Sequence, residues 1–321
     1  MTGSSAPEVV AIGETLGLIR PLGAGRLRHT LRASLGIGGA ESNLAIAVSR
    51  LGHRAAWVGR VGADAWGDLI LDELRAEGVD VSRARVDPER STGLMLKHQQ
   101  VNGATSVTYA RRDSAGSALS PVDIPEDLIA SGRVLHVSGI TPALSPSAAA
   151  AVDHAIDLAR ATGGTVSVDL NYRKRLWNAR DAIPALRKLA ASADILFAGE
   201  DEAALLAGPL TLEQTCEALA AIGPKHVILK RGSLGAIALI RDEVVRVDAA
   251  PVAALVDPVG AGDAFDAGYL AAFLEDLNPA ASLSLAARVG ALAVSGPGDW
   301  ESVPHRRMLE DTLTLHESVD R

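Results

Sequence analysis

The stretch DPVGAGDAF, from Asp257 to Phe265, places two acidic residues around a glycine-rich turn. Gly260 and Gly262 permit backbone angles that a side chain would forbid, so consecutive N–H groups can point toward one bound anion. Apolar residues then recur at helical spacing from Leu270 to Leu277, which predicts that the turn opens a helix whose dipole also favours negative charge. These nine residues therefore predict an anion-binding turn with a carboxylate at its edge.

Asp263 falls in the first turn of this predicted helix. A carboxylate there is poorly suited to bind phosphate, but it can take a proton from an alcohol that attacks one. In that hypothesis Gly260, Ala261 and Gly262 stabilise the charge on a transferring phosphoryl group with their N–H groups. An isolated GxGD more often marks a plain helix cap, and on these residues alone that alternative stays open.

The rest of the chain predicts an α/β fold. Short β-branched runs at 9–13, 55–62, 134–140, 165–170, 194–199 and 226–232 alternate with helical patterns, which indicates a mainly parallel central sheet flanked by helices. Ser145-Pro146 predicts a helix start. Segments at about 15–37 and about 92–112 show the apolar-polar alternation of antiparallel strands and predict a small β-sheet lid. No linker or repeat divides the sequence, so we expect one domain, residues 1–321, that carries this lid.

Composition, charge and cysteine content indicate what kind of partner and compartment to expect. Hydrophobic residues make up 48% of the chain and aromatic residues 3%, as expected for a core of aliphatic side chains. A formal net charge of −8 disfavours a nucleic-acid partner and favours a small molecule. The single cysteine, Cys216, cannot form an internal disulfide and is expected to pack in a helix. The opening MTGSSAPEVV resembles no secretion signal and no segment reads as a membrane span, which predicts a cytoplasmic protein without a membrane partner.

Several longer stretches carry a resemblance to a known family. DPVGAGDAF is similar to the signature near the C-terminus of ribokinase-like carbohydrate kinases. Their N-terminal signature resembles GGAESNLAIAVSRLG at 38–52, VGRVGADAWGDLI at 58–70 and LRAEGVDVS at 74–82, in the same order and spacing. Within that family, YARRDSAGSALSP at 109–121, LHVSGITPALSP at 135–146 and DLNYRKRLW at 169–177 look most like 2-keto-3-deoxygluconate kinases. The resemblance implies a ribokinase-like fold and the ATP-dependent phosphorylation of a sugar-acid hydroxyl.

The same resemblance implies roles for individual residues. A planar guanidinium matches the carboxylate of a sugar acid with paired hydrogen bonds, although without the family context Arg111 and Arg112 could be a solvated loop pair. Asp299 could equally form a turn. The residues that match substrate-binding positions are Gly39, Asn43, Tyr109, Arg111, Arg173 and Asp299. The residues that match ATP-binding positions are Asn171, Arg231, Gly232, Ser233 and Gly235.

The resemblance also implies that two kinds of metal ion bind. Mg²⁺ is expected to bind with the nucleotide, and the family often carries Asn-x-x-Glu for water-mediated contacts. Here Gly199 replaces the Asn while Glu202 remains. Asp257 is expected either to order its loop or to contribute to the monovalent-cation site, for K⁺, of some relatives. Met95 and Ala110 stand where sugar-acid kinases tend to carry tyrosines, which could shift the specificity.

The predicted partners are a small-molecule sugar acid and ATP, together with a second copy of the chain. The lid strands expose an apolar face that a small sheet cannot bury alone, so we expect at least a homodimer through the lid. Two other functions stay open, namely a neutral-sugar kinase acting on fructose or a nucleoside and a non-catalytic sugar-binding relative. A Rossmann dehydrogenase is disfavoured, because GETLGL rather than GxGxxG follows the first predicted strand.

Overall fold

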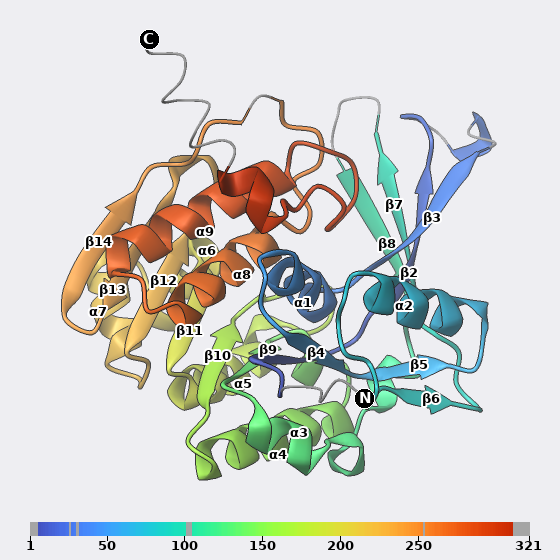
Figure 1. The fold of residues 1–321 in the computed structure, drawn as a ribbon, viewed down its shortest axis with the longest axis horizontal. Helices are drawn as coiled ribbons and strands as arrows, with labels where there is room; N and C mark the ends of the chain where they lie inside the picture. Colours follow the sequence, from blue (N-terminus) through green and yellow to red (C-terminus); the bar gives the residue numbers. More distant parts are fainter. Residues whose placement is uncertain (1–5, 26, 30–31, 101–104, 253, 311–321) are drawn as a thin grey trace.

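The computed structural model describes residues 6–310 apart from residues 26, 30–31, 101–104 and 253. A twisted eight-stranded sheet runs through the centre in the order β14-β13-β12-β11-β10-β9-β1-β4 (Figure 1). The first six of these strands along the chain pair in parallel, and β13 and β14 extend the edge antiparallel. The predicted α/β class with a mainly parallel sheet is confirmed. The strands are β1 Val9–Ile12, β4 Ala55–Val58, β9 Val134–Ser138, β10 Thr165–Asp169, β11 Ile195–Gly199, β12 His226–Lys230, β13 Ala236–Ile240 and β14 Glu243–Val247.

Helices cover both faces of this sheet, because successive strand side chains point to opposite sides. Val9 and Ala11 of β1 join the apolar cluster beneath one helix layer, whereas Val10 and Ile12 join the cluster beneath the other. One layer contains α1 Ala40–Arg50, α2 Ala65–Ala76, α8 Ala261–Leu274 and α9 Pro279–Ala293. The other contains α3 Glu126–Ser131, α4 Pro146–Ala161, α5 Ala179–Ser192, α6 Glu200–Ala207 and α7 Leu212–Ala220.

Local signals in the sequence fix several of these helices. The Ser145 side chain accepts a hydrogen bond from the Ala148 N–H at the start of α4, as predicted for an N-cap followed by proline. Cys216 is buried within α7. None of the helices in the described part of the chain combines the length and apolar character that crossing a bilayer requires.

A separate four-stranded sheet stands beside the central one (Figure 1). Its order is β3-β2-β7-β8, with antiparallel pairing within β2/β3 and within β7/β8. The two hairpins join through parallel pairing of β2 with β7, which a purely antiparallel interpretation did not anticipate. Residues 26, 30–31 and 101–104 of the predicted lid segments lie outside the described residues. The strands are β2 Leu16–Pro21, β3 Ala33–Gly38, β7 Leu94–Gln99 and β8 Thr105–Ala110.

One predicted strand is divided in the structure. The segment 55–62 splits at Gly59 into β4 in the central sheet and β5 Arg60–Gly62, which pairs with β6 Arg85–Asp87. A Cβ at Gly59 would lie 2.4 Å from the backbone oxygen of Gly13 and 2.3 Å from the Trp57 ring. The chain therefore leaves the central sheet at Gly59, where the backbone of Gly13 and the Trp57 ring leave no room for a side chain.

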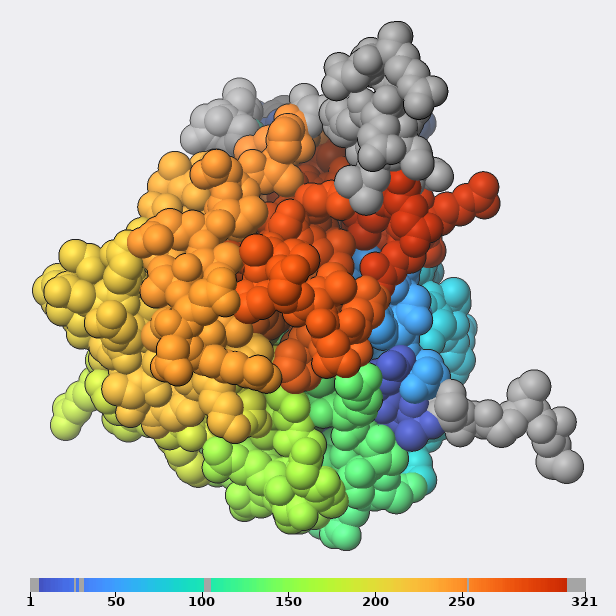
Figure 2. All heavy atoms as spheres, turned by 60° about the vertical axis from the view of Figure 1, so that its left-hand side comes forward, coloured from blue at the N-terminus to red at the C-terminus, as the bar shows by residue number. Residues whose placement is uncertain are grey.

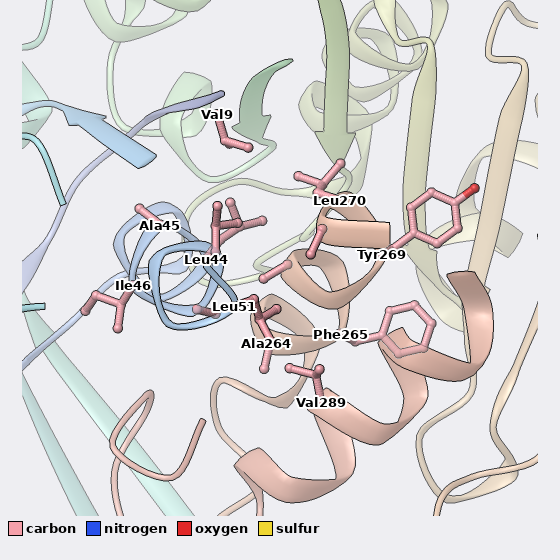
Figure 3. Packing of buried hydrophobic residues seen from close by; sticks show 14 of the residues in the cluster. Val9, Leu44, Ala45, Ile46, Leu51, Ala264, Phe265, Tyr269, Leu270 and Val289 are labelled. Atoms are coloured by element: carbon pink, nitrogen blue, oxygen red, sulfur yellow. The ribbon is translucent and has the colours of Figure 1, made fainter. Parts of the chain in front are cut away.

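Packing of α1 against α8 brings together two signatures that lie 220 residues apart. Leu44 of α1 and Leu51, which directly follows this helix, face Ala264 and Leu270 of α8 in a continuous apolar cluster (Figure 3). The end of the described chain, red in Figure 2, lies against the blue N-terminal segments, where Arg50 donates to the backbone oxygen of Val303 at 2.8 Å. These contacts hold the N-termini of α1 and α8 side by side at one cavity.

Candidate active site

A cavity of about 1080 Å³ lies between the small sheet, the carboxyl ends of the central strands and the N-termini of α1 and α8. Ligands of open α/β sheets bind at this end of the strands. Among the predicted site residues, Ala261, Gly232, Ser233, Gly235 and Asp257 do not line it. Those that do line it are Gly39, Asn43, Tyr109, Arg111, Asn171, Arg173, Glu202, Arg231, Gly260, Gly262, Asp263 and Asp299.

The glycine turn at the base of the cavity has the backbone conformation that its sequence requires. Gly260 caps α8 with φ of 83°, in the left-handed region, and a Cβ there would lie 1.7 Å from the backbone oxygen of Asp299. A side chain is therefore excluded both by conformation and by space. The N-terminus of α8, which carries Asp263 in its first turn, faces the cavity beyond this turn.

Asp263 is partly buried and held by one hydrogen bond from another helix. The Asn43 amide nitrogen donates to Asp263 Oδ2 at 2.8 Å, and the Gly39 N–H donates to Asn43 Oδ1 at 3.4 Å. No hydrogen bond to Asp263 Oδ1 is found within the described residues, so this oxygen can accept from a ligand. Asn43, predicted as a sugar contact, thus also positions the candidate base.

Burial, opposed by the Asn43 hydrogen bond, Lys230 and Arg173 and assisted by the nearby charge of Asp169, raises the pKa of Asp263 to about 7. A carboxylate with a pKa near neutrality can accept a proton and release it again at physiological pH. The N-cap residue of α8 is Gly260, which has no side chain to cap the helix, and Asp263 is the acidic residue of its first turn.

A buried ammonium beside the base was not predicted. Lys230 Nζ lies 2.9 Å from Asp169 Oδ2 and 3.0 Å from Asp266 Oδ2. Burial alone would lower the pKa of Lys230, but the charges of these two acids outweigh it and raise that pKa. Burial raises the pKa of Asp266 well above its ordinary value. The charges of Lys230 and Asp169 reach Asp263 as well, where Lys230 lowers and Asp169 raises a pKa that burial raises most.

Arg111, at the other end of the cavity, forms an ion pair with the buried Glu14 and is not a solvated loop residue. Its Nε donates to Glu14 Oε2 at 2.7 Å, and its Nη2 contacts the same oxygen. Ser114 donates to the other oxygen of Glu14, and the guanidinium lies 5.6 Å from the centre of the Tyr109 ring. Two nitrogens of Arg111 are therefore engaged by Glu14, no hydrogen bond from its Nη1 is found within the described residues, and its neighbour Arg112 is exposed.

The loop after β10 borders the cavity between these two ends. Asn171 is buried with φ of 36°, and Arg173 is exposed into the cavity. Glu202 caps α6, because its two carboxylate oxygens accept from the N–H groups of Gly199 and Tyr172, each at 2.8 Å. Burial raises the pKa of Glu202, and the charge of Asp169 raises it further.

The predicted nucleotide loop follows β12. Gly232 and Gly235 have φ of 55° and 83° and bracket a tight turn that contains Ser233. Arg231 at its start lines the cavity and donates from Nε to Glu200 Oε1 at 2.7 Å.

Asp257 and Asp299 share a second unpredicted lysine. Lys97 Nζ lies 2.5 Å from Asp257 Oδ2 and 2.6 Å from Asp299 Oδ1, and all three side chains are buried. Asp257 Oδ1 also accepts from the Val259 N–H at 3.2 Å, which orders the loop before the glycine turn. Burial raises the pKa of Asp299, and the charge and hydrogen bond of Lys97 oppose that rise.

Within the described residues no group of three or more His, Cys, Asp or Glu side chains is arranged to hold a metal ion. A hydrated Mg²⁺ that arrives on a nucleotide needs few protein ligands. Asp169 lines the cavity, and its Oδ1 has no hydrogen-bond partner among the described atoms, so it could accept from the water of such an ion.

The residues that sequence reasoning missed had weak signals. Lys97 lies two residues after the buried Met95 on β7, so the period of two places both side chains on the inward face. Asp169 and Lys230 end buried parallel strands, where ligand sites form. Glu14 carried no comparable signal, since its contact with Arg111 joins residues 97 positions apart.

Comparisons with known proteins agree with this geometry. Residues 6–306 match the family described as pfkB family carbohydrate kinases. The 2-dehydro-3-deoxygluconokinase of Bacillus subtilis (strain 168) is 36% identical over 314 residues, which are 97% of each chain. The fructokinase of Klebsiella pneumoniae is 32% identical over 314 residues, covering 95% of this chain and 99% of that one. Among solved structures, a putative ribokinase II from E. coli in complex with ATP and Mg²⁺ has a TM-score of 0.89 at 28% identity, covering 97% of this chain and 100% of that one.

Proposed function

This chain belongs to the pfkB family of ATP-dependent carbohydrate kinases, and from that premise we propose that its substrate is the sugar acid 2-keto-3-deoxygluconate, also called 2-dehydro-3-deoxygluconate. The enzyme would transfer the γ-phosphoryl group of ATP to the terminal hydroxyl of this acid. The observation that carries the proposal is Arg111, a guanidinium that lines the cavity and is held by the buried Glu14 through Nε and Nη2. A carboxylate is the substrate group that a guanidinium binds most strongly.

The other end of the cavity supplies the chemistry. Asp263 Oδ1 would accept the proton of the substrate hydroxyl while Oδ2 stays bound to Asn43. The N–H groups at Gly260, Ala261 and Gly262, with the dipole of α8, would stabilise charge on the transferring phosphoryl group. Closure of the small sheet as a lid over the sugar would exclude water, which otherwise accepts the phosphoryl group.

The nucleotide would occupy the side of the cavity near the loop after β12. Arg231, Gly232, Ser233 and Gly235 are proposed to border it together with Asn171, and Arg173 would lie between the sugar and the phosphates. Mg²⁺ bound to ATP would neutralise charge on the phosphates, with Asp169 or Glu202 holding its water.

A neutral-sugar kinase is the second candidate, and three observations favour it. Glu14 already balances the charge of Arg111, and Met95 rather than a tyrosine faces the sugar side of the cavity. A fructokinase is 32% identical to this chain. Both candidates share Asp263 and the glycine turn, so variants of Arg111 can distinguish them.

The test compares kcat/KM for 2-keto-3-deoxygluconate, fructose and nucleosides in the wild type and in Arg111→Ala. Hydrogen bonds to charged groups contribute about 1.5–3 kcal/mol, so we expect a loss of roughly ten- to a hundredfold for the acid and much less for a neutral sugar. Arg111→Lys should recover part of the loss, because an ammonium supplies the charge without the planar fork. Arg112→Ala, an exposed neighbour, is the matched control and should leave both substrates unchanged.

Equal losses for acid and neutral substrates would assign Arg111 to folding of the small sheet and would move the neutral-sugar candidate ahead. Absence of ADP formation with every sugar and sugar acid would instead favour a binding protein. Thermal-shift measurements with a non-hydrolysable ATP analogue separate these outcomes from misfolding, because a bound ligand raises Tm by mass action.

A further inference from the structure

Lys97 is a lysine whose ammonium lies inside the protein between two carboxylates. Its side chain is 4% exposed, and its Nζ contacts Asp257 Oδ2 at 2.5 Å and Asp299 Oδ1 at 2.6 Å. Both acids are also buried. Two buried carboxylates this close to one point would repel each other strongly, and a single positive charge between them removes that repulsion.

These two acids support the anion-binding turn from below. Asp257 accepts from the N–H groups of Val259 and Gly298, at 3.2 and 3.3 Å, and so ties the loop before the turn to the loop after α9. The backbone oxygen of Asp299 occupies the space beside the Gly260 Cα, where a Cβ would lie 1.7 Å from it. Whatever neutralises the two carboxylates therefore also fixes the turn that binds phosphate.

A monovalent cation, which the family resemblance implies at Asp257, does not fit this arrangement. An ion coordinated by Asp257 Oδ2 would stand against Lys97 Nζ, which lies 2.5 Å from that oxygen, and like charges at such a distance repel. The other oxygen of Asp257 already accepts from a backbone N–H. The Asp257 carboxylate that a cation would use is therefore already occupied by Lys97 and by backbone N–H groups.

We propose that Lys97 takes the place of a monovalent cation, so that this kinase orders its anion-binding turn without K⁺. The ammonium carries the same single charge, but it is attached to β7 of the small sheet, which also supplies Met95 to the sugar side of the cavity. The position of that sheet is thereby coupled to the phosphate end of the site. A free ion could not make this connection.

The wild-type protein gives the first test. In buffers of matched ionic strength made with choline, sodium or potassium chloride, Tm and kcat/KM should agree within about 1 °C and about twofold, because a buried ion pair is screened little by salt. Activation by K⁺ of about tenfold or more, or a rise in Tm specific to K⁺, would overturn the proposal. The Tm measurement needs no sugar, so it stands even if the proposed substrate is wrong.

Lys97→Met gives the second test, because it keeps the length of the side chain and removes the charge. We expect Tm in choline to fall by roughly 5 °C or more, since removing one partner of a buried pair leaves the other uncompensated. Potassium should restore part of this loss in Tm, together with part of the lost activity. Lys188→Met is the matched control, because Lys188 also pairs with a carboxylate at 2.6 Å but is 67% exposed on α5, and it should show neither loss nor rescue.

Two results of the second test would contradict the proposal. A Lys97→Met protein with wild-type activity in choline would show that the ammonium is dispensable. A loss that no monovalent cation reverses would show that Lys97 packs the small sheet without standing in for an ion. If the variant does not fold, the cation dependence of the wild type decides the question alone.

Discussion

Asp263 offers the sharpest test of the catalytic assignment through the pH dependence of the reaction. A base with a pKa of about 7 is half ionised at pH 7, about a tenth ionised at pH 6 and about nine-tenths ionised at pH 8. If this carboxylate takes the proton of the substrate hydroxyl, kcat/KM should rise about fivefold from pH 6 to pH 7 and about twofold from pH 7 to pH 8. The rise should then level off. A coupled assay of ADP formation, with the coupling enzymes in excess at each pH, measures this profile.

Asp263→Asn should remove both the activity and this profile. The amide oxygen can still accept from Asn43, whose nitrogen lies 2.8 Å from the native carboxylate, so the fold and both binding sites should survive. General-base catalysis contributes about 100- to 10,000-fold, and kcat should fall by an amount in that range. Residual activity should no longer rise through pH 7. A kcat near that of the wild type, or an unchanged profile, would refute the role of Asp263 as base and return it to a helix cap.

The same substitution makes a stability prediction that does not depend on substrate. The pKa of Asp263 in the folded protein lies above its ordinary value, so the folded state binds this proton more tightly than the unfolded chain does. Stability from this group is therefore present at low pH and is lost as pH rises toward and through about 7. Asp263→Asn cannot ionise, so its Tm relative to the wild type should increase between pH 5 and pH 8, as differential scanning calorimetry can measure. A constant difference would contradict the raised pKa.

Three further predictions concern the groups around the site. Lys230→Met should move the acid limb of the pH profile upward, because the ammonium opposes the rise in the pKa of Asp263; a profile that stays in place would exclude this coupling. Glu14→Gln should raise KM for the sugar acid by up to about tenfold with little change in kcat, since Arg111 loses a charged partner that holds it; an unchanged KM would show that Glu14 does not position it. Light scattering at micromolar concentration should find at least a dimer, and Leu35→Asp, at a side chain 65% exposed on the small sheet, should weaken it; a wild-type monomer would count against pairing through this sheet.

The sequence was most informative where physical rules act over short distances. Alternating strands and helices indicated the parallel sheet, and Ser145 marked the start of α4, because periodicity and capping depend on neighbours within a few residues. The glycines around Asp263 similarly indicated a turn at a helix start. The rule that ligands bind at strand ends applies to Asp169 and Lys230. Their contact with each other could be identified only from the folded structure.

What the sequence left undetermined depends on pairs that are distant along the chain. Lys97 meets Asp299 across 202 positions, and nothing near either residue selects the other as its partner. The same holds for Glu14 and Arg111, whose ion pair joins residues 97 positions apart. Such pairs decide the electrostatics of the site, so composition and motifs identify the class of reaction more readily than the preferred sugar.

The parallel pairing of β2 with β7 has a consequence for how the protein folds. Hairpins β2/β3 and β7/β8 form from residues close together in the sequence. Joining the two hairpins brings Gly17 beside Leu94 and closes a long loop that contains α1, β4 and α2. Loop closure of this length is slow, because its entropic cost precedes the contacts that reward it. We therefore expect the sugar end of the cavity to acquire protection from hydrogen exchange after the phosphate end during refolding. In the native protein the junction between these two hairpins should also be among the first places to open.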